Sequence, residues 1–171
     1  MAELELESRR EIYGQIDANP GIHFRALLDR LDYAQGTLQY HLRWLADEGL
    51  VDVSDDGKYT RYYPSDAFDE TDRAVMNALR REYSRRIAAH LAADGPLTTA
   101  ELSDRIGKAR STVSWHLSNL EDEGLVTKER DGRAVRYSLT DPERVTRLYT
   151  IHRKSFTDRL VDRLLGLWDA Y

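Results

Sequence analysis

Residues 35–51 read QGTLQYHLRWLADEGLV, and residues 110–126 read RSTVSWHLSNLEDEGLV. The two stretches lie 75 positions apart, and the correspondence continues without a gap from residues 20–66 to residues 95–141. A gapless match of this length is typical of an internal repeat. The chain is therefore predicted to use one module twice.

Three helices are predicted in each copy of the module. The third is the clearest, because its apolar residues recur at i, i+4 and i+7 and a glycine ends it. Thr98 and Glu101 form the capping-box pattern that starts the second helix of the later copy. The second and third helices are expected over residues 24–31 and 35–48 in the first copy, and over residues 99–106 and 110–123 in the second.

A β-hairpin is predicted after the third helix of each copy, at the Asp-Gly pairs of residues 56–57 and 131–132. Helix, helix, tight turn, helix and hairpin is the order of a winged helix-turn-helix. The sequence therefore predicts a mainly α fold with small β-hairpin wings. It comprises module 1 in residues 1–66, a linking helix and module 2 in residues 67–140, and a long C-terminal helix in residues 141–171.

The composition excludes several classes of protein. The 171 residues include no cysteine, which excludes disulfides, thiolate nucleophiles and Cys-ligated zinc, and the five histidines lack the spacing of a helix-borne metal site. No apolar run reaches the ~18 residues that a membrane span needs, which favours a cytoplasmic protein without membrane contact. Phosphate-loop and nucleophile motifs are missing, so neither an enzyme nor a cofactor is expected. The sequence does not specify a small-molecule effector.

Charge is distributed unequally between the two copies. The net charge of −5, taken alone, argues against a partner as acidic as DNA. Residues 1–66 carry −6, residues 67–140 carry 0 and residues 141–171 carry +1. Arginine supplies 21 of the 25 basic residues, a bias similar to that of proteins from salt-loving archaea. Because the acidity is concentrated in the first copy, the second is expected to hold a duplex better.

The repeated stretches also carry a family likeness. Residues 21–25 (GIHFR) followed by residues 36–42 resemble archaeal winged helix-turn-helix transcriptional regulators. Residues 111–117, with residues 120 and 123–126, resemble the recognition-helix pattern of ArsR-type and MarR-type regulators. The resemblance implies DNA binding, with the third helix in the major groove and the wing against the backbone. One departure is alanine at positions 34 and 109, where such families usually have a serine cap, which weakens the helix start by about 1 kcal/mol.

The side chains expected to contact DNA follow from this resemblance and from their chemistry. Glutamine can pair with adenine, arginine with guanine, and serine or threonine with either. On the third helices these residues are Arg110, Ser111, Thr112, Ser114 and Trp115 in the second copy, and Gln35, Thr37, Gln39, Tyr40 and Arg43 in the first. On the wings, the basic residues expected at phosphates are Lys128, Arg130, Arg133 and Arg136 in the second copy, and Lys58 and Arg61 in the first. The alternative interpretation is that these side chains are the solvated faces of packed helices and hairpins.

The C-terminal segment is expected to mediate dimerisation. Asp141 and Pro142 are a typical N-cap and first helical residue. Apolar residues then follow at helical spacing, and the predicted dimer contacts are Val145, Tyr149, Phe156, Leu160, Leu164, Leu167 and Trp168. A helix of ~45 Å is too long to bury this stripe on one module, so a symmetric partner helix and hence a homodimer are expected. The alternative is a helix that folds back across both copies.

The sequence therefore predicts a transcriptional regulator that binds double-stranded DNA as a dimer, at a pseudo-palindromic site. The alternative is a winged-helix interaction or assembly factor that does not read DNA sequence, and the acidity of the first copy favours it. That copy is alternatively a partner-binding or sensing module. The basic wing and the Ser/Thr/Arg helix of the second copy favour DNA.

Overall fold

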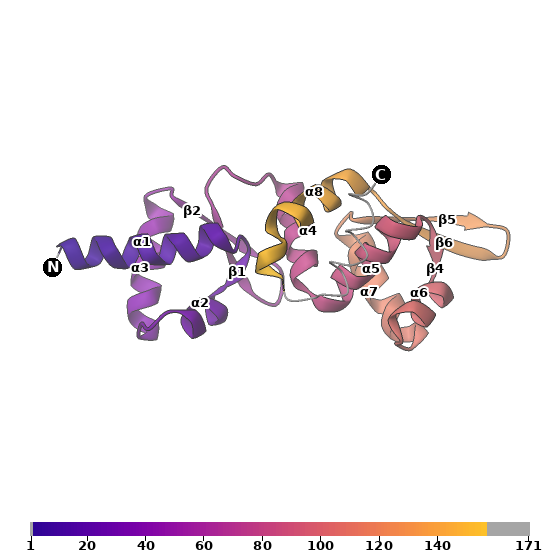
Figure 1. Ribbon diagram of the computed structural model, residues 1–171, viewed down its shortest axis with the longest axis horizontal. Helices are drawn as coiled ribbons and strands as arrows, with labels where there is room; N and C mark the ends of the chain where they lie inside the picture. The colour runs from indigo at the N-terminus through magenta and orange to yellow at the C-terminus, as the bar shows by residue number, and fades with distance from the viewer. Residues whose placement is uncertain (1, 157–171) are drawn as a thin grey trace. The chain divides into compact units, whose positions relative to one another are not determined.

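The structure, a computed structural model, describes residues 2–156, with side chains from residue 5 onward. The chain divides into two compact units, unit 1 (Met1–Arg73) and unit 2 (Ala74–Tyr171). Each unit combines helices with a small three-stranded antiparallel sheet (Figure 1). Among the described residues, no helix has both the length and the apolar character needed to cross a membrane.

Unit 1 contains a first helix, a helix-turn-helix and a hairpin, in that order (Figure 1). Its elements are α1 (Ala2–Ala18), β1 (Ile22–His23), α2 (Phe24–Arg30), α3 (Gln35–Asp47), β2 (Val51–Asp55) and β3 (Thr60–Pro64). The strands pair in the order β1-β3-β2, so that Tyr62 of β3 lies opposite Ile22 on one side and Val53 on the other. Helix α4 (Glu70–Arg80) follows and contains the boundary between the units.

Unit 2 repeats this order of elements. They are α5 (Glu82–Asp94), β4 (Leu97–Thr98), α6 (Thr99–Ile106), α7 (Arg110–Asp122), β5 (Val126–Asp131), β6 (Ala134–Leu139), α8 (Pro142–His152) and a short 3-10 turn, η1 (Arg153–Ser155). The strand order is β4-β6-β5, which matches that of unit 1. The two ends of α7 lie 75 positions after the two ends of α3. The internal repeat of the sequence is therefore a repeat of structure, and the predicted winged helix-turn-helix order is confirmed.

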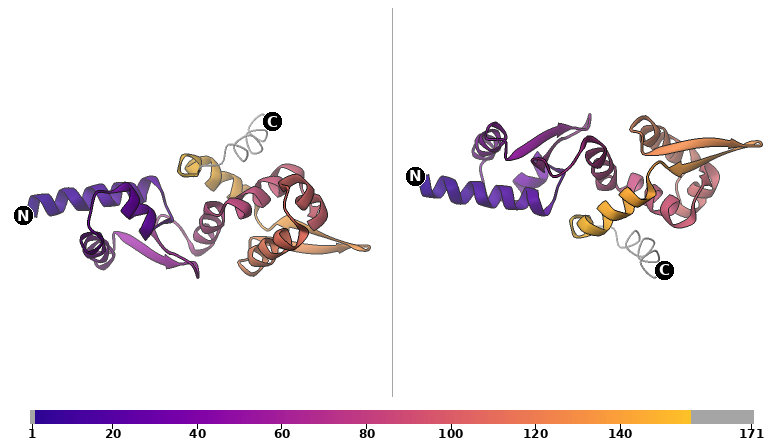
Figure 2. Two further views of the ribbon diagram at one scale, coloured as in Figure 1. Left: turned by 90° about the horizontal axis from the view of Figure 1, so that it is seen from below. Right: turned by 90° about the horizontal axis from the view of Figure 1, so that it is seen from above.

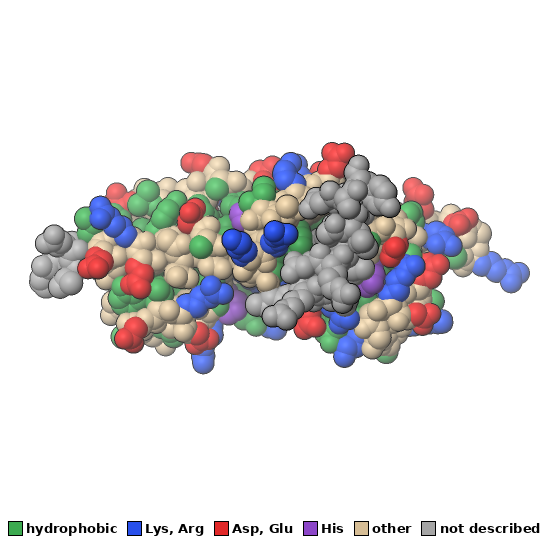
Figure 3. Space-filling model, viewed as in Figure 1, with side chains coloured by type: hydrophobic (Ala, Val, Ile, Leu, Met, Phe, Trp, Pro, Cys, Tyr) green, Lys and Arg blue, Asp and Glu red, His purple; other side chains and the backbone are tan. Residues whose placement is uncertain are grey.

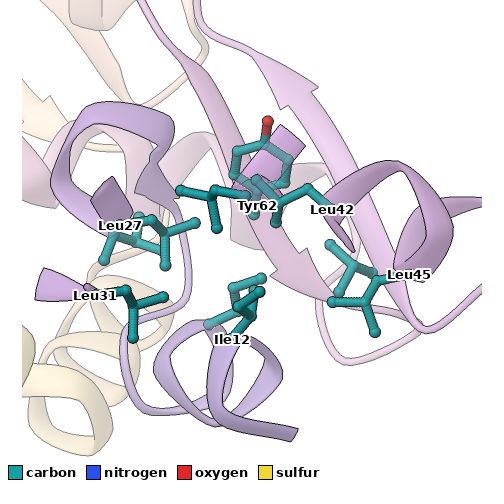
Figure 4. Packing of buried hydrophobic residues seen from close by; sticks show 10 residues of the cluster. Ile12, Leu27, Leu31, Leu42, Leu45 and Tyr62 are labelled. Atoms are coloured by element: carbon teal, nitrogen blue, oxygen red, sulfur yellow. The ribbon is translucent and has the colours of Figure 1, made fainter. Parts of the chain in front are cut away.

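The core of unit 1 forms where one face of each helix meets the sheet (Figure 4). Ile12 and Ile16, one turn apart on α1, are fully buried. The core also contains Leu27 and Leu31 of the α2 region, Leu38, Leu42 and Leu45 of α3, and Ile22, Val51 and Tyr62 of the sheet. Burying a leucine or isoleucine side chain contributes about 1.5–3 kcal/mol. The apolar stripe of α3 is thereby fixed inward, and its opposite face is left for solvent.

Unit 2 builds its core from the equivalent positions. The buried residues include Ile87 and Leu91 of α5, Leu102 and Ile106 of α6, and Val113, Leu117 and Leu120 of α7. Helix α8 adds Val145, Leu148 and Tyr149. The linking segment at the start of residues 67–140 contains two helices, α4 and α5, which are separated at Arg81, whose backbone is extended.

The C-terminal helix differs from its predicted form. Helix α8 starts as expected, with the Arg144 amide donating to Asp141 Oδ1 at 3.1 Å, but it ends at His152. Beyond η1, Phe156 folds back so that its ring stacks on Tyr149 at a centroid distance of 5.6 Å. Three predicted dimer contacts are thus buried in this chain's own core: Val145, Tyr149 and Phe156. The predicted contacts Leu160, Leu164, Leu167 and Trp168 lie outside the described residues.

Candidate nucleic-acid interface

Helix α7 has one buried face and one exposed face. Val113, Leu117 and Leu120 are almost completely buried. Of the five predicted base-contacting residues, Arg110, Ser111, Ser114 and Trp115 are exposed and Thr112 is half-buried. Trp115 is 63% exposed, which is unusual for so large an aromatic side chain. Four of the five predicted residues are thus accessible to a partner, and their contact with DNA stays a prediction.

The N-terminus of α7 lacks a side-chain cap. Ala109 is the N-cap residue and makes no side-chain hydrogen bond, whereas Thr98 and Glu101 form a complete capping box at the start of α6. The first amides of α7 therefore carry unsatisfied partial positive charge, which favours an anion. Arg110 is the first residue of this helix and has no ion-pair partner in the described part of the chain. Cationic and hydrogen-bond-donating groups thus gather at one end of α7.

Helix α3 of unit 1 shows the same division into two faces. Leu38, His41, Leu42 and Leu45 are buried. The predicted contact residues Gln35, Thr37, Gln39, Tyr40 and Arg43 are all exposed. Ala34, the N-cap residue, again makes no side-chain hydrogen bond. The outer face of α3 therefore presents two glutamine amides and one guanidinium group.

The β5–β6 hairpin forms an arm that extends from unit 2. Gly132, with a φ of 63°, makes the tight turn between the paired residues Asp131 and Ala134. The hairpin extends past the helices of unit 2 in both views of Figure 2, and Figure 3 shows basic side chains at its end. Arg130 and Arg133 are exposed and have no ion-pair partner in the described part of the chain.

Two further basic residues lie along this hairpin, each near an acid. Lys128 is exposed, with its Nζ 3.2 Å from Glu121 Oε2. Arg136 is half-buried, with its guanidinium 3.3 Å from the carboxylates of both Glu101 and Asp131. Exposed pairs of this kind contribute only about 0–1 kcal/mol, so they leave the cations able to exchange partners.

The β2–β3 hairpin of unit 1, in contrast, is tied to the body of that unit. Arg61 is 2% exposed, and it donates to Asp56 Oδ2 at 2.5 Å and to the carbonyl oxygen of Gly21 at 2.8 Å. The other carboxylate oxygen of Asp56 accepts the amides of Lys58 and Tyr59. The guanidinium of Arg61 is therefore buried and hydrogen-bonded within unit 1, so the prediction that Arg61 contacts phosphate is not supported. Lys58 stays exposed.

An aromatic stack closes the same hairpin. The ring of Tyr59 lies on that of His23 with a centroid distance of 4.3 Å and an angle of 13° between the planes. His23 also caps α2, since its Nδ1 accepts the amide of Ala26 at 3.1 Å. In unit 2 the positions of Tyr59 and His23 are occupied by Ala134 and Thr98, which cannot form such a stack. The β2–β3 hairpin of unit 1 is therefore packed against its own unit by an aromatic stack that the β5–β6 hairpin of unit 2 lacks.

Comparison with known proteins places this architecture in a family. Residues 6–76 match the model of an N-terminal helix-turn-helix domain, and residues 68–127 match the winged helix-turn-helix DNA-binding family. The transcriptional activator HlyU of Vibrio cholerae is 30% identical over 79 residues, which are 46% of this chain and 72% of HlyU. The chain belongs to the helix-turn-helix transcriptional regulators.

Two further comparisons describe how far the likeness to these regulators extends. An uncharacterized HTH-type transcriptional regulator of Methanocaldococcus jannaschii is 30% identical over 135 residues, or 79% of this chain. This chain spans 34% of the length of that archaeal regulator. The solved structure of HlyU shares 28% identity and a TM-score of 0.43, over 49% of this chain and 90% of HlyU.

One pair that positions the third helix of this regulator was not predicted from the sequence. Arg81, at the start of α5, donates both Nη1 and Nη2 to the two carboxylate oxygens of Glu123, at 2.8 and 2.6 Å. Glu123 is the C-cap residue of α7. A bidentate pair of this geometry fixes the C-terminal end of α7 against the first helix of its unit. The two residues are far apart in the sequence, so no local pattern could have indicated the pair.

Two equivalent histidines, His41 and His116, lie behind the exposed rings of the third helices. The ring of Tyr40 is 5.2 Å from that of His41, and the ring of Trp115 is 4.9 Å from that of His116. Burial lowers the pKa of both histidines, and the charges of Arg9 and Arg81 respectively add to this effect. Both imidazoles are therefore neutral at pH 7. Within the described residues, no group of three or more potential metal ligands lies together.

Proposed function

We propose that this chain binds double-stranded DNA and regulates transcription, with unit 2 as the main DNA-binding part. The observation that carries the proposal is a group of arginines on α7 and on the extended β5–β6 hairpin that have no acidic partner among residues 5–156: Arg110, Arg130 and Arg133. Helix α7 is the width that a major groove accepts, and its N-terminal residues would meet base edges. The hairpin arginines would then lie at flanking phosphates, which supply most of the affinity.

The second candidate function, a winged-helix interaction factor, is favoured only for unit 1. Residues 1–66 carry a net charge of −6, and the hairpin of this unit has its arginine buried. With Lys58 as its one exposed cation, this wing contributes less than the wing of unit 2 to holding a polyanion. Unit 1 is therefore proposed to contribute base contacts from α3 at most, while unit 2 supplies the electrostatic hold on the duplex.

The two functions are distinguished by fluorescence anisotropy of a labelled duplex titrated with the full chain over a series of salt concentrations. DNA binding through phosphates predicts that log K falls linearly with log salt concentration, by about 0.9 for each phosphate contacted. A heat-denatured sample of the same protein is the control. Binding that does not exceed this control, or that is independent of salt, would contradict the proposal.

The Arg110→Ala variant is expected to bind a specific site about 10-fold to 100-fold more weakly, because a bidentate arginine–guanine contact contributes about 1–3 kcal/mol. Binding to random DNA should change much less. The matched control is Arg110→Lys, which keeps the charge but loses the planar pair of donors. Equal losses on specific and random duplexes, or full activity of the lysine variant, would show that Arg110 contacts phosphate and not a base.

The regulator is further proposed to act as a homodimer through residues 157–171. Leu160, Leu164 and Leu167 keep helical spacing there, while Val145 and Tyr149 are already used in the core of unit 2. Light scattering should give a dimer for the full chain and a monomer for a chain that ends at Phe156. Circular dichroism of the shortened chain checks that it remains folded. A shortened chain that is still dimeric would place the interface elsewhere.

A further inference from the structure

The outer face of α7 offers few groups that can distinguish one base from another. Ser111, Ser114 and Ser118 are exposed there. A hydroxyl group both donates and accepts, so each serine can bond to any base edge and discriminates weakly. Between Ser111 and Ser118, in the middle of the helix, the one exposed side chain that is not a serine is the indole of Trp115. Most sequence information from the middle of this helix must therefore come from an aromatic ring.

The indole is held in place by its neighbours, although most of it is exposed. Its ring packs edge-on against His116 at a centroid distance of 4.9 Å and an angle of 79°. His116 in turn packs on Tyr83 at 5.5 Å, and Lys108 Nζ lies 5.3 Å from the centre of the Tyr83 ring. A ring whose orientation is already fixed loses less conformational freedom on binding. Trp115 is thus arranged as a contact surface.

The first copy of the repeat carries the same arrangement. Tyr40 lies 75 positions before Trp115, is 54% exposed, and packs edge-on against His41 at 5.2 Å. Single exposed apolar residues are common on proteins and need no explanation. An exposed aromatic ring at the same position of both third helices, each supported by a histidine, indicates a shared role on the outward face.

We propose that Trp115 recognises the 5-methyl group of thymine in the major groove. This inference rests on the proposed function of unit 2. Thymine is the base whose major-groove edge carries an apolar group, and an apolar side chain discriminates by contacting it. Burying one methyl group contributes about 0.8 kcal/mol, which corresponds to about a fourfold change in affinity. The class of ligand is therefore a duplex with thymine opposite the middle of α7.

The test uses a duplex that the full chain itself selects from a random library. Each thymine of this duplex is replaced in turn by uracil, which removes the methyl group and nothing else. We expect one thymine opposite each α7 whose replacement weakens binding about fourfold. Trp115→Ala should bind more weakly and should lose this sensitivity, whereas Tyr40→Ala, the matched variant in unit 1, should keep it. Cytosine at that position should bind better once it is 5-methylated.

The outcomes separate this inference from the function on which it rests. If the chain enriches no duplex from the library, both DNA reading and the role of Trp115 are wrong. If a duplex is enriched but no thymine is sensitive to uracil, or Trp115→Ala keeps the sensitivity, DNA binding stands and the role of Trp115 is overturned. Because Trp115 is outside the core, a melting curve should show that Trp115→Ala folds as the unmodified chain does.

Discussion

The Arg61→Gln variant is expected to lower the free energy of unfolding of unit 1 by about 3–5 kcal/mol. The side chains of Arg61 and Asp56 are only 3% and 7% exposed, and the guanidinium also bonds to the Gly21 carbonyl. Removing the cation leaves the carboxylate buried without a charge partner, which is the costly way to break such a pair. Since small domains have net stabilities of about 5–15 kcal/mol, unit 1 of this variant should be close to unfolding.

The pH dependence gives the prediction a second readout. Burial acts to raise the pKa of Asp56, but hydrogen bonds from Arg61, Tyr59 and Lys58 outweigh it and hold the pKa below its ordinary value. A carboxyl group with a lowered pKa stabilises the fold above its unfolded-state pKa, and this stability is lost as the pH falls through the folded-state pKa. Without Arg61, burial is opposed only by the amides of Tyr59 and Lys58, so the pKa of Asp56 should rise, and protonation then removes the cost of burying the charged carboxylate. The stability difference between wild type and variant should therefore narrow as the pH is lowered towards 4, a value near the ordinary aspartate pKa of about 3.9.

The measurement is urea unfolding followed by circular dichroism and by tryptophan fluorescence, to which Trp44 at the core of unit 1 and Trp115 in unit 2 both contribute. The matched control is Arg136→Gln, because Arg136 occupies the equivalent position in unit 2. Its pair with Asp131 has side chains that are 37% and 74% exposed, so the control should lose less than about 1 kcal/mol. Equal losses in the two variants would contradict the interpretation of the Arg61–Asp56 pair as a buried clamp.

Replacing both Arg130 and Arg133 with glutamine is expected to weaken binding to every duplex, on the order of 50-fold at 0.1 M salt. The same variant should reduce the slope of log K against log salt concentration by about 1.8, because two phosphate contacts are lost. Both side chains are exposed on the hairpin, so neither change should affect folding. Salt titrations by fluorescence anisotropy on a specific and a random duplex provide the measurement.

Lys58→Gln is the matched control for this variant. Lys58 lies in the wing of unit 1 at the position equivalent to Arg133, and it is also exposed. If unit 2 supplies most of the electrostatic attraction to DNA, the slope of log K against log salt concentration for Lys58→Gln should differ from that of wild type by less than about 0.9, the change expected for one phosphate contact. A control that loses as much slope as the unit 2 variant would assign the hold to both wings. If the slope of log K against log salt concentration is unchanged in both variants, neither wing contacts phosphates.

Much of the fold could be predicted because two copies of one pattern support each other. Helix α3 was expected over residues 35–48 and occupies Gln35–Asp47, and α7 was expected over residues 110–123 and occupies Arg110–Asp122. The stripe of apolar residues and the terminal glycine are local signals, and local signals determine where a helix starts and ends. The exposed positions of Trp115 and Tyr40 followed from the same stripe.

The difference between the two wings could not be predicted from local pattern. Both hairpins contain Asp-Gly, at residues 56–57 and 131–132, and then Arg-Tyr, at residues 61–62 and 136–137. Arg61 lies 5.4 Å from the centre of the Tyr59 ring, and that ring stacks on His23, which is distant in the sequence and meets Tyr59 only after folding. The end of α8 at His152 was not predicted either, because the helical periodicity of the sequence continues past it, whereas in the structure Phe156 stacks on Tyr149 of the same helix.

The central claim is that unit 2 holds the duplex. Its most direct test is to attach a DNA-cleaving reagent to one wing at a time and to measure whether the bound duplex is cut. The chain has no cysteine, so Arg133→Cys and Lys58→Cys each provide one attachment point for a hydroxyl-radical-generating chelate. The two positions are equivalent in the repeat, which makes each variant the control of the other. We predict cleavage of the bound duplex from position 133 and little or none from position 58. Cleavage from position 58 alone, or from neither while binding persists, would contradict the assignment.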